Sequence, residues 1–158
     1  KIVLTRPNVS TGRSLGYFPG SVEEKMTPWL KPIMNVLQDG LGKGRFDYMV
    51  SKEQIQIQPI ETIRGNSFEN CIIVVDESQN LNMSEIKAIT TRIGENAKLV
   101  LLGDPAQSDV HDGEALDEFV EMCHHYGIEA PIVRFTTDHI VRSDIVAQLV
   151  KMFARNNI

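Results

Sequence analysis

The chain has 158 residues, 42% of them hydrophobic and 23% charged, with a formal net charge of −5. These values exclude a disordered chain, and no apolar run is long enough to span a membrane. We therefore expect one globular domain over residues 1–158 without membrane attachment. Because the net charge is negative, nucleic acid would have to be bound by a local basic patch or across an oligomer.

Strand and helix patterns alternate along the chain. A strand over residues 1–5 ends at Thr5-Arg6-Pro7, because proline lacks an N–H and restricts the residue before it. The later elements are predicted in this order: a loop over 8–20, a helix over 21–40, an edge or half-exposed strand over 55–60, a strand over 71–75, a helix over 82–93, a strand over 98–102, a helix over 114–126, a strand over 132–135 and a helix over 143–155. The alternation predicts right-handed crossovers and a three-layer α/β/α fold with a mostly parallel sheet.

The last predicted helix carries apolar residues at helical spacing. We expect these side chains to face the protein interior. They are Ile145, Val146, Leu149, Val150 and Phe153.

The two cysteines form no recognisable metal or disulfide pattern. Cys71 falls in a predicted core strand, and Cys123 falls in a predicted helix beside His124 and His125. Adjacent residues point to different sides of a helix, so we do not expect the two histidines to bind one metal ion. We interpret both cysteines as core thiols of a reducing compartment and predict a cytoplasmic protein.

The glycine-rich segment 40–45 does not fit a phosphate loop. That loop requires Gly five residues before a Gly-Lys pair and Ser or Thr after it, but Leu37 and Gly44 occupy those positions around Lys43. We interpret the segment as a helix end and turn, and we find no phosphate loop in the chain.

Acidic side chains follow the apolar strand 71–75. Its continuous run of apolar residues is typical of a central parallel strand covered on both faces, and ligands of open α/β sheets bind outside the carboxyl ends of such strands. Asp76 and Glu77 follow at that end. In nucleotide-hydrolysing P-loop proteins, the first acid after this strand helps to hold Mg²⁺, and a neighbouring acid can polarise the attacking water. The order Asp then Glu suits this chemistry.

A second predicted core strand, 98–102, ends in a similar way. Asp104 and the amide Gln107 follow it, and Gly103 between them and the strand is expected to allow a close backbone approach. A single acid after a strand often only ends the strand, but two polar clusters about one βα unit apart favour a functional site.

A series of short motifs resembles the PhoH family of P-loop ATPases. The motifs are Thr5-Arg6-Pro7, residues 16–20, Ile63-Arg64-Gly65, residues 75–80, residues 103–109 and Val141-Arg142. Their order and spacing match the family along essentially the whole chain. The family is similar to the ATPase core of superfamily 1 helicases, and members joined to a PIN nuclease domain act as RNA helicases and nucleases. The resemblance implies ATP hydrolysis with Mg²⁺, a ring-shaped homo-oligomer such as a hexamer, and action on single-stranded RNA.

The resemblance also implies roles for the polar residues at the strand ends. Asp76 corresponds to the Mg²⁺-associated acid and Glu77 to the water-activating acid. Residues at three further positions match polar residues expected to sense the γ-phosphate of ATP: Gln79, Asp104 and Gln107.

Basic residues of the motifs receive roles in the same way. Arg64 and Arg142 match family arginines that neutralise phosphate charge, and we expect at least one of them to act on ATP held by a neighbouring subunit. Thr5 and Arg6 match the element that helicase cores place beside the nucleic-acid strand. For each arginine, an ordinary surface ion pair is the alternative.

The chain departs from the family pattern in three places. The phosphate loop and the strand before it are expected upstream of Lys1, and without them most phosphate binding is lost. We therefore expect the isolated chain to be inactive. The usual Ala after Asp-Glu is Ser78, a small-for-small change, and the usual His-Pro after Val-Arg is Ser143-Asp144, which could alter how Arg142 is presented.

Two alternatives to an ATPase stay open. One is a non-hydrolysing subunit that binds nucleotide or RNA and works through assembly. The other is a metal-dependent nuclease built from Asp76, Glu77, Asp104 and Asp109. The nuclease is the weaker alternative, because two-metal sites usually contain a broader set of carboxylates and histidines.

Overall fold

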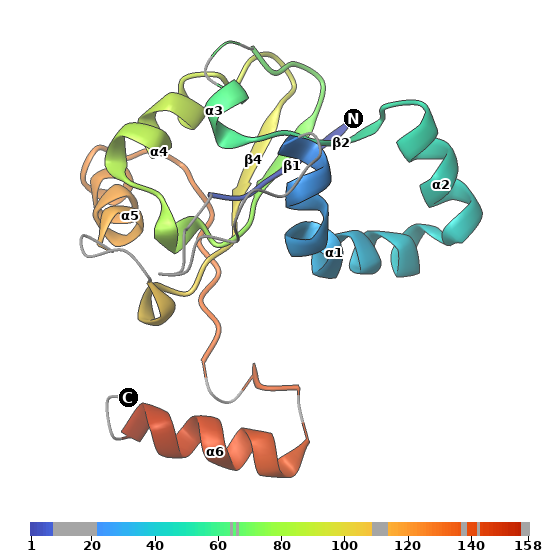
Figure 1. Ribbon diagram of the computed structural model, residues 1–158. Helices are drawn as coiled ribbons and strands as arrows, with labels where there is room; N and C mark the ends of the chain where they lie inside the picture. The colour runs from blue at the N-terminus through green and yellow to red at the C-terminus, as the bar shows by residue number, and fades with distance from the viewer. Residues whose placement is uncertain are drawn as a thin grey trace.

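The computed structural model describes residues 1–7, 22–63, 65, 67–108, 114–136, 139–141 and 143–155. Within these ranges, four strands form one sheet in the order β2-β1-β3-β4, and every neighbouring pair is parallel (Figure 1). The strands are β1 (Ile2–Thr5), β2 (Ile55–Ile57), β3 (Ile72–Val75) and β4 (Lys98–Leu101). The predicted α/β fold with a parallel sheet is confirmed.

Successive side chains of a strand point to opposite faces of the sheet, and in this structure helices cover both faces. In β1, Val3 packs in the core beneath α3, α4 and α5, whereas Leu4 packs against Leu30 of α1 and Phe46 of α2. Figure 1 shows the same division, with α1 and α2 on one side of the strands and α3, α4 and α5 on the other. The helices are α1 (Val22–Leu41), α2 (Lys43–Ser51), α3 (Ile60–Ile63), α4 (Met83–Thr90), α5 (Ala115–His125) and α6 (Asp144–Arg155).

The helix predicted at 82–93 begins as expected and ends earlier. Asn82 Oδ1 accepts a hydrogen bond from the Glu85 backbone N–H at 3.0 Å, and Glu85 Oε2 accepts one from the Asn82 N–H at 3.0 Å, which forms a capping box. The helix stops at Thr90. Ile93 instead forms a parallel β-bridge with Phe68, so it does not continue the buried helix face.

Two short helices were not predicted. The interpretation of 40–45 as a helix end and turn is wrong beyond Gly42, because α2 begins at Lys43. Glycines lower helix propensity, so the sequence pattern did not indicate this helix. The buried side chain of Phe46 anchors it against the sheet. The strand predicted over 55–60 stops at Ile57, and α3 begins at Ile60. In the sheet formed by the described residues, β2 lies at an edge, which agrees with the predicted edge or half-exposed strand.

The carboxyl-terminal part of the chain differs most from the expectations. No strand forms over 132–135 in the part of the chain that the structure describes, and Val133 and Phe135 are 75% and 80% exposed. Strand propensity alone does not make a strand, because its backbone groups need a neighbouring strand edge.

Helix α6 lies apart from the sheet and the other helices (Figure 1). The expectation that its apolar residues face the interior is therefore wrong here: Ile145, Val146, Leu149, Val150 and Phe153 are 38–62% exposed. Among the helices described, none has the length and apolar content needed to cross a membrane.

Two further expectations concern the core. Cys71 and Cys123 are free and buried, as core thiols should be. Strand β4, which was predicted as a core strand, lies instead at one edge of the sheet formed by the described residues, with Val100 38% exposed.

Candidate functional site

Asp76 and Glu77 lie directly beyond the carboxyl end of β3. The backbone N–H of Asp76 donates to the carbonyl of Thr5 at 2.9 Å, so the pairing of β1 with β3 extends one residue past the strand. Glu77 has φ 51° and ψ 39°, a left-handed conformation that costs a non-glycine residue about 1 kcal/mol. The chain then turns into the short 3-10 helix η1 (Ser78–Asn80). The strained turn therefore sits at the acid that was predicted to act on water.

Gln79 joins the end of β3 to the end of β4. Its side chain is 1% exposed, and its Nε2 donates to Glu77 Oε2 at 2.6 Å. Its Oε1 accepts from the backbone N–H of Asp104 at 3.1 Å, and its Nε2 lies 3.5 Å from the carbonyl of Gln107. When the donor and the acceptor of a buried amide are both hydrogen-bonded, the amide fixes the relative position of the groups that it joins. In this structure Gln79 positions Glu77.

The two strand ends approach each other closely at Gly103. A Cβ at this position would lie 2.8 Å from Gln79 Oε1, 2.8 Å from Ser78 Oγ and 2.9 Å from the Gln79 backbone N. These distances confirm the predicted close approach. Ser78 uses both of its donors on the carbonyl of Leu102, with the backbone N–H and the hydroxyl each at 2.8 Å. The Ser78 hydroxyl is thus part of the contact between the two strand ends.

Asp104 and Gln107 lie on the outer side of this junction. Both are exposed, and Gln107 Nε2 donates to Asp104 Oδ2 at 2.6 Å. Gln107 belongs to the 3-10 helix η2 (Pro105–Gln107). The predicted polar residues of both strand ends are therefore gathered at one edge of the sheet, connected through Gln79.

Arg6 contacts both carboxylates of the pair. Its guanidinium Nη1 lies 3.8 Å from Asp76 Oδ2, and its Nη2 lies 3.7 Å from Glu77 Oε1. The same guanidinium donates to the backbone carbonyl of Trp29 at 3.3 Å, and its Cζ lies 5.6 Å from the centre of the Trp29 ring. Sequence reasoning missed Trp29, because nothing in its own segment indicates that α1 brings it to the strand end.

Burial is the main influence on the pKa of Asp76. Desolvation raises the pKa above the ordinary value of an aspartate, and the adjacent Glu77 charge raises it further. The backbone N–H of Glu77 and the Arg6 guanidinium act in the opposite direction without cancelling the rise. The fold therefore holds the charged form of Asp76 at a cost that a bound cation would offset.

The donor chemistry of this edge fits a magnesium ion. The hydroxyl of Thr5 is buried and has no hydrogen-bond partner among the described groups, and the carboxylates of Asp76 and Glu77 lie at the neighbouring strand end. Mg²⁺ is usually held by one or two carboxylates, with phosphate oxygens and water as its other ligands. Among the described residues, no group of three or more His, Cys, Asp and Glu is placed to bind a metal ion. Any further ligands of such an ion would therefore have to be phosphate oxygens, water or groups outside the described residues.

Several predicted site residues stay untested. Arg64, Arg142 and Asp109 lie outside the described residues. The Thr5 side chain is fully buried, and the partly exposed Arg6 side chain contacts the acids. Their contact with nucleic acid stays a prediction.

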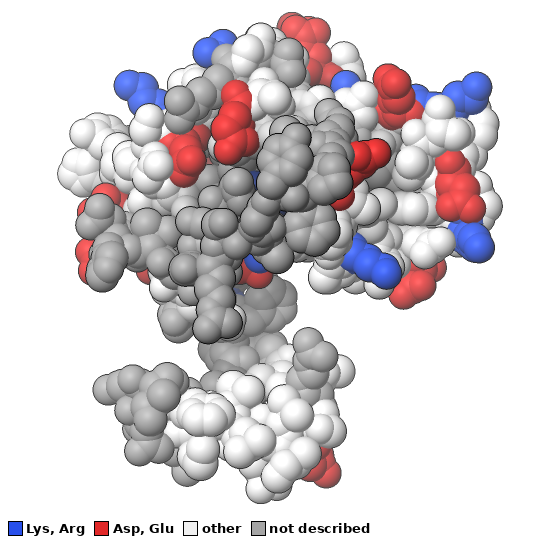
Figure 2. All heavy atoms as spheres, in the orientation of Figure 1, with Lys and Arg blue, Asp and Glu red and all other residues white. Residues whose placement is uncertain are grey.

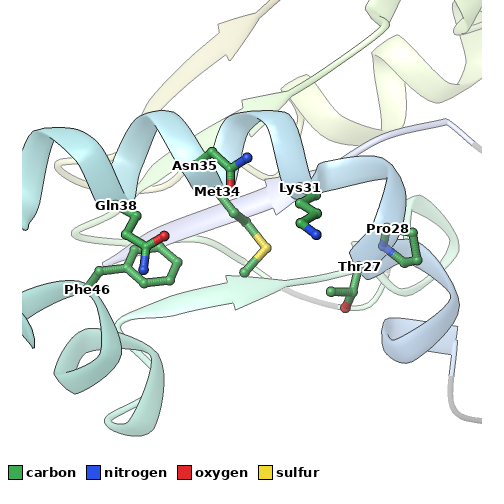
Figure 3. Close-up of a pocket in the computed structure, with 7 residues that line it drawn as sticks. All are labelled: Thr27, Pro28, Lys31, Met34, Asn35, Gln38 and Phe46. Carbon is green, nitrogen blue, oxygen red and sulfur yellow. The ribbon is translucent and has the colours of Figure 1, made fainter. Parts of the chain in front are cut away.

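Two surface features lie away from the acids. A groove of about 360 Å³ runs between α1 and α2, and Figure 3 shows residues of both helices around it. Its lining consists of Thr27, Pro28, Lys31, Met34, Asn35, Gln38 and Phe46. On the face drawn in Figure 2, blue and red side chains are interspersed over the described residues, without a continuous basic stripe. Neither feature defines a second candidate for the chemistry.

A parallel sheet with acidic and amide side chains at the carboxyl ends of adjacent strands is consistent with a P-loop nucleoside triphosphatase, although other open α/β folds also bind ligands at this edge. The family model described as PhoH-like protein matches residues 1–154. The chain belongs to this family, which is a family of P-loop ATPases.

Curated relatives give the same result. The chain is 31% identical over 158 residues to the PhoH-like protein of Bacillus subtilis (strain 168). This match covers 99% of this chain and 50% of the relative. It is 32% identical over 162 residues to Protein PhoH of Escherichia coli (strain K12), covering 98% of this chain and 44% of the relative. Protein PhoH2 of Bacillus subtilis (strain 168) is 41% identical over 113 residues, covering 69% of this chain and 26% of the relative. The chain thus spans half or less of the length of these relatives.

Proposed function

We propose that this chain carries the acidic half of an ATP-hydrolysing site in a PhoH-type ATPase. The observation that supports this most is the pair Asp76 and Glu77 beyond a central parallel strand, with Glu77 held by the buried Gln79. Asp76 would hold Mg²⁺, which supplies positive charge to the phosphates when it is bound. The family membership supports the ATPase class, and the residue roles are our proposal.

Glu77 is proposed to orient and deprotonate the attacking water. The Gln79 amide donates to Oε2 of Glu77, and the turn at Glu77 fixes where its backbone leaves β3. A carboxylate held in this way can accept the proton of a water molecule aligned with the γ-phosphate, and general-base catalysis contributes about 10²–10⁴ in rate. Asp104 and Gln107 are proposed to contact the γ-phosphate, since they lie at the exposed side of the same junction.

The phosphate-binding part of the site has to come from elsewhere. No Gly-x-x-x-x-Gly-Lys-Ser/Thr segment occurs among the 158 residues. Such a loop provides backbone N–H groups, a lysine and a metal-binding hydroxyl to the phosphates. We therefore propose that hydrolysis requires a protein in which this loop is present together with these residues, and that the 158-residue chain alone does not turn over ATP.

Action on RNA and assembly into a ring are further parts of the proposal. In such a ring, an arginine that neutralises phosphate charge would come from a neighbouring subunit, and Arg64 and Arg142 are the candidates. An arginine supplied in this way contributes about 10³–10⁵ in rate, whereas a surface ion pair contributes about 0–1 kcal/mol to stability.

The test is to measure phosphate release from ATP and cleavage of end-labelled single-stranded RNA by a full-length protein that contains these residues and a phosphate loop. We expect Mg²⁺-dependent phosphate release that RNA stimulates, without ATP-independent cleavage. ATP binding without phosphate release would support the non-hydrolysing subunit instead. Metal-dependent RNA cleavage without ATP would support the nuclease.

Mixed assemblies test the shared arginine. Full-length Arg64→Ala or Arg142→Ala, inactive alone, should regain part of the activity when co-assembled with an inactive Glu77→Gln partner. Mixed interfaces would then pair an intact base with an intact arginine. Full activity of both single arginine variants, or an active monomer in sedimentation, would contradict the shared site.

A further inference from the structure

Arg6 connects the acid pair to helix α1. Its guanidinium is within 3.8 Å of Asp76 and 3.7 Å of Glu77, and it also donates to the Trp29 carbonyl at 3.3 Å and lies over the Trp29 ring. Trp29 precedes Leu30, which is 0% exposed and anchors α1 in the core against Leu4. The backbone around Trp29 is therefore fixed, and Arg6 is the adjustable partner in this contact.

The guanidinium is held loosely by the carboxylates. Charge-assisted hydrogen bonds between nitrogen and oxygen are usually about 2.7–2.9 Å long, and both ion-pair distances here are longer. The Arg6 side chain is 27% exposed, so water can replace its partners when it moves. A contact of this kind can be exchanged for another cation without breaking a short, buried hydrogen bond.

We propose that Arg6 is a positioning residue that neutralises Asp76 and Glu77 until a divalent cation binds at Asp76, and that its displacement by the cation changes its contact with Trp29. The proposal rests on the proposed ATPase function, in which Asp76 holds the metal ion. Two cations at the same carboxylates repel each other, so metal binding favours withdrawal of the guanidinium. Loading of the metal site would then be communicated to α1 through a single side chain.

Trp29 is the only tryptophan of the chain, so its fluorescence reports on this contact without labelling. The experiment titrates the 158-residue chain with Mg²⁺ at constant ionic strength and records the emission spectrum. Binding of Mn²⁺ is measured separately by electron paramagnetic resonance. We expect Mg²⁺ to change the Trp29 emission of the wild type and to leave that of Asp76→Asn unchanged.

Variants of Arg6 separate its two contacts. Arg6→Gln removes the competing charge and should bind Mn²⁺ roughly two- to five-fold more tightly than the wild type, the range expected for a partly exposed ion pair. Its Trp29 emission should no longer respond to Mg²⁺. Arg6→Lys keeps a charge but loses the planar group over the ring, so it should bind Mn²⁺ like the wild type with a smaller emission change. The control is Arg134→Gln, which removes an exposed pair with Asp117 and should behave like the wild type.

The outcomes separate this proposal from the proposed function. Mn²⁺ binding that requires Asp76, together with an unchanged Trp29 emission, would overturn the role of Arg6 and leave the metal site standing. Equal Mn²⁺ affinity of Arg6→Gln and the wild type would do the same. Mn²⁺ binding that does not depend on Asp76 would overturn both proposals. Thermal unfolding of each variant, with a transition as cooperative as that of the wild type, shows that the chain is folded in these measurements.

Discussion

The amide nitrogen of Gln79 donates a hydrogen bond to the carboxylate of Glu77 at 2.6 Å, while the amide oxygen accepts from the backbone N–H of Asp104 at 3.1 Å. One neutral, buried side chain thus needs both its donor and its acceptor to join the two strand ends. A carboxylate in its place has no donor to offer Glu77.

The first prediction concerns Gln79→Glu, which keeps the shape of the side chain. We expect the free energy of unfolding to fall by about 1–3 kcal/mol at neutral pH, because two carboxylates then face each other at a buried position. The deficit should shrink at acidic pH, where one of the two acids takes up a proton. Urea denaturation from acidic to neutral pH measures this difference in the free energy of unfolding. A variant as stable as the wild type at neutral pH would contradict the role of Gln79 in joining the two strand ends.

The second prediction compares two glycines. Gly103→Ala places a Cβ 2.8 Å from two side-chain oxygens and 2.9 Å from a backbone nitrogen, so we expect a loss of about 1–3 kcal/mol from overpacking. A Cβ added at Gly44, inside α2, would meet nothing within 4 Å beyond the backbone of its own helix. Gly44→Ala should instead stabilise by roughly 0.5–1 kcal/mol through helix propensity. Chemical denaturation of both variants tests the pair, and equal effects would argue against the close approach at Gly103.

The third prediction concerns the left-handed backbone at Glu77. Glu77→Gly and Glu77→Ala both remove the contacts of the carboxylate, but only glycine adopts φ 51° without strain. We expect the glycine variant to be more stable than the alanine variant by about 1 kcal/mol, as measured by urea denaturation. If the alanine variant is the more stable one, the turn does not have this conformation in solution.

The fourth prediction follows from the raised pKa of Asp76. A raised pKa in the folded state means that folding favours the protonated acid, so this stabilisation is present at low pH and is lost as the pH rises through the carboxyl range. Asparagine resembles the protonated form. In the presence of EDTA, Asp76→Asn should therefore unfold at a higher temperature than the wild type at neutral pH, and the difference should vanish at acidic pH.

A control for this measurement is Asp117→Asn, which alters an exposed carboxylate of α5. It should change the stability by less than about 0.5 kcal/mol at any pH in the range. A lower unfolding temperature of Asp76→Asn at neutral pH would show that the contact with Arg6 outweighs the burial of the charge.

Local patterns were sufficient to predict the acidic edge of the sheet. The continuous apolar run before Asp76 indicated a central strand, and parallel strands bring their carboxyl ends together. Gly103 was predicted to permit a close approach because only a residue without a Cβ can do so. The start of α4 could be predicted because its capping box depends on residues only three apart.

Features that depend on distant packing could not be predicted in this way. The α2 helix is stabilised by the packing of Phe46, which overrides the low helix propensity of its neighbouring glycines. Segment 132–135 has strand-forming residues, but a strand also needs a partner edge that its own sequence does not specify. The contact between Arg6, which follows β1, and Trp29 of α1 spans 23 positions of the chain, and neither local pattern indicates the other.

The most direct test of the proposed ATPase site is the rate of ATP hydrolysis by Glu77→Gln in a full-length protein with its phosphate loop. The amide keeps the shape of the side chain and removes the base, so the rate should fall by about 10²–10⁴ while ATP is still bound. Single-turnover measurement of phosphate release, with ATP affinity determined on the same preparation, separates the chemical step from binding. Unchanged ATP affinity with this loss of rate is the predicted result, and hydrolysis at the wild-type rate would contradict the role of Glu77.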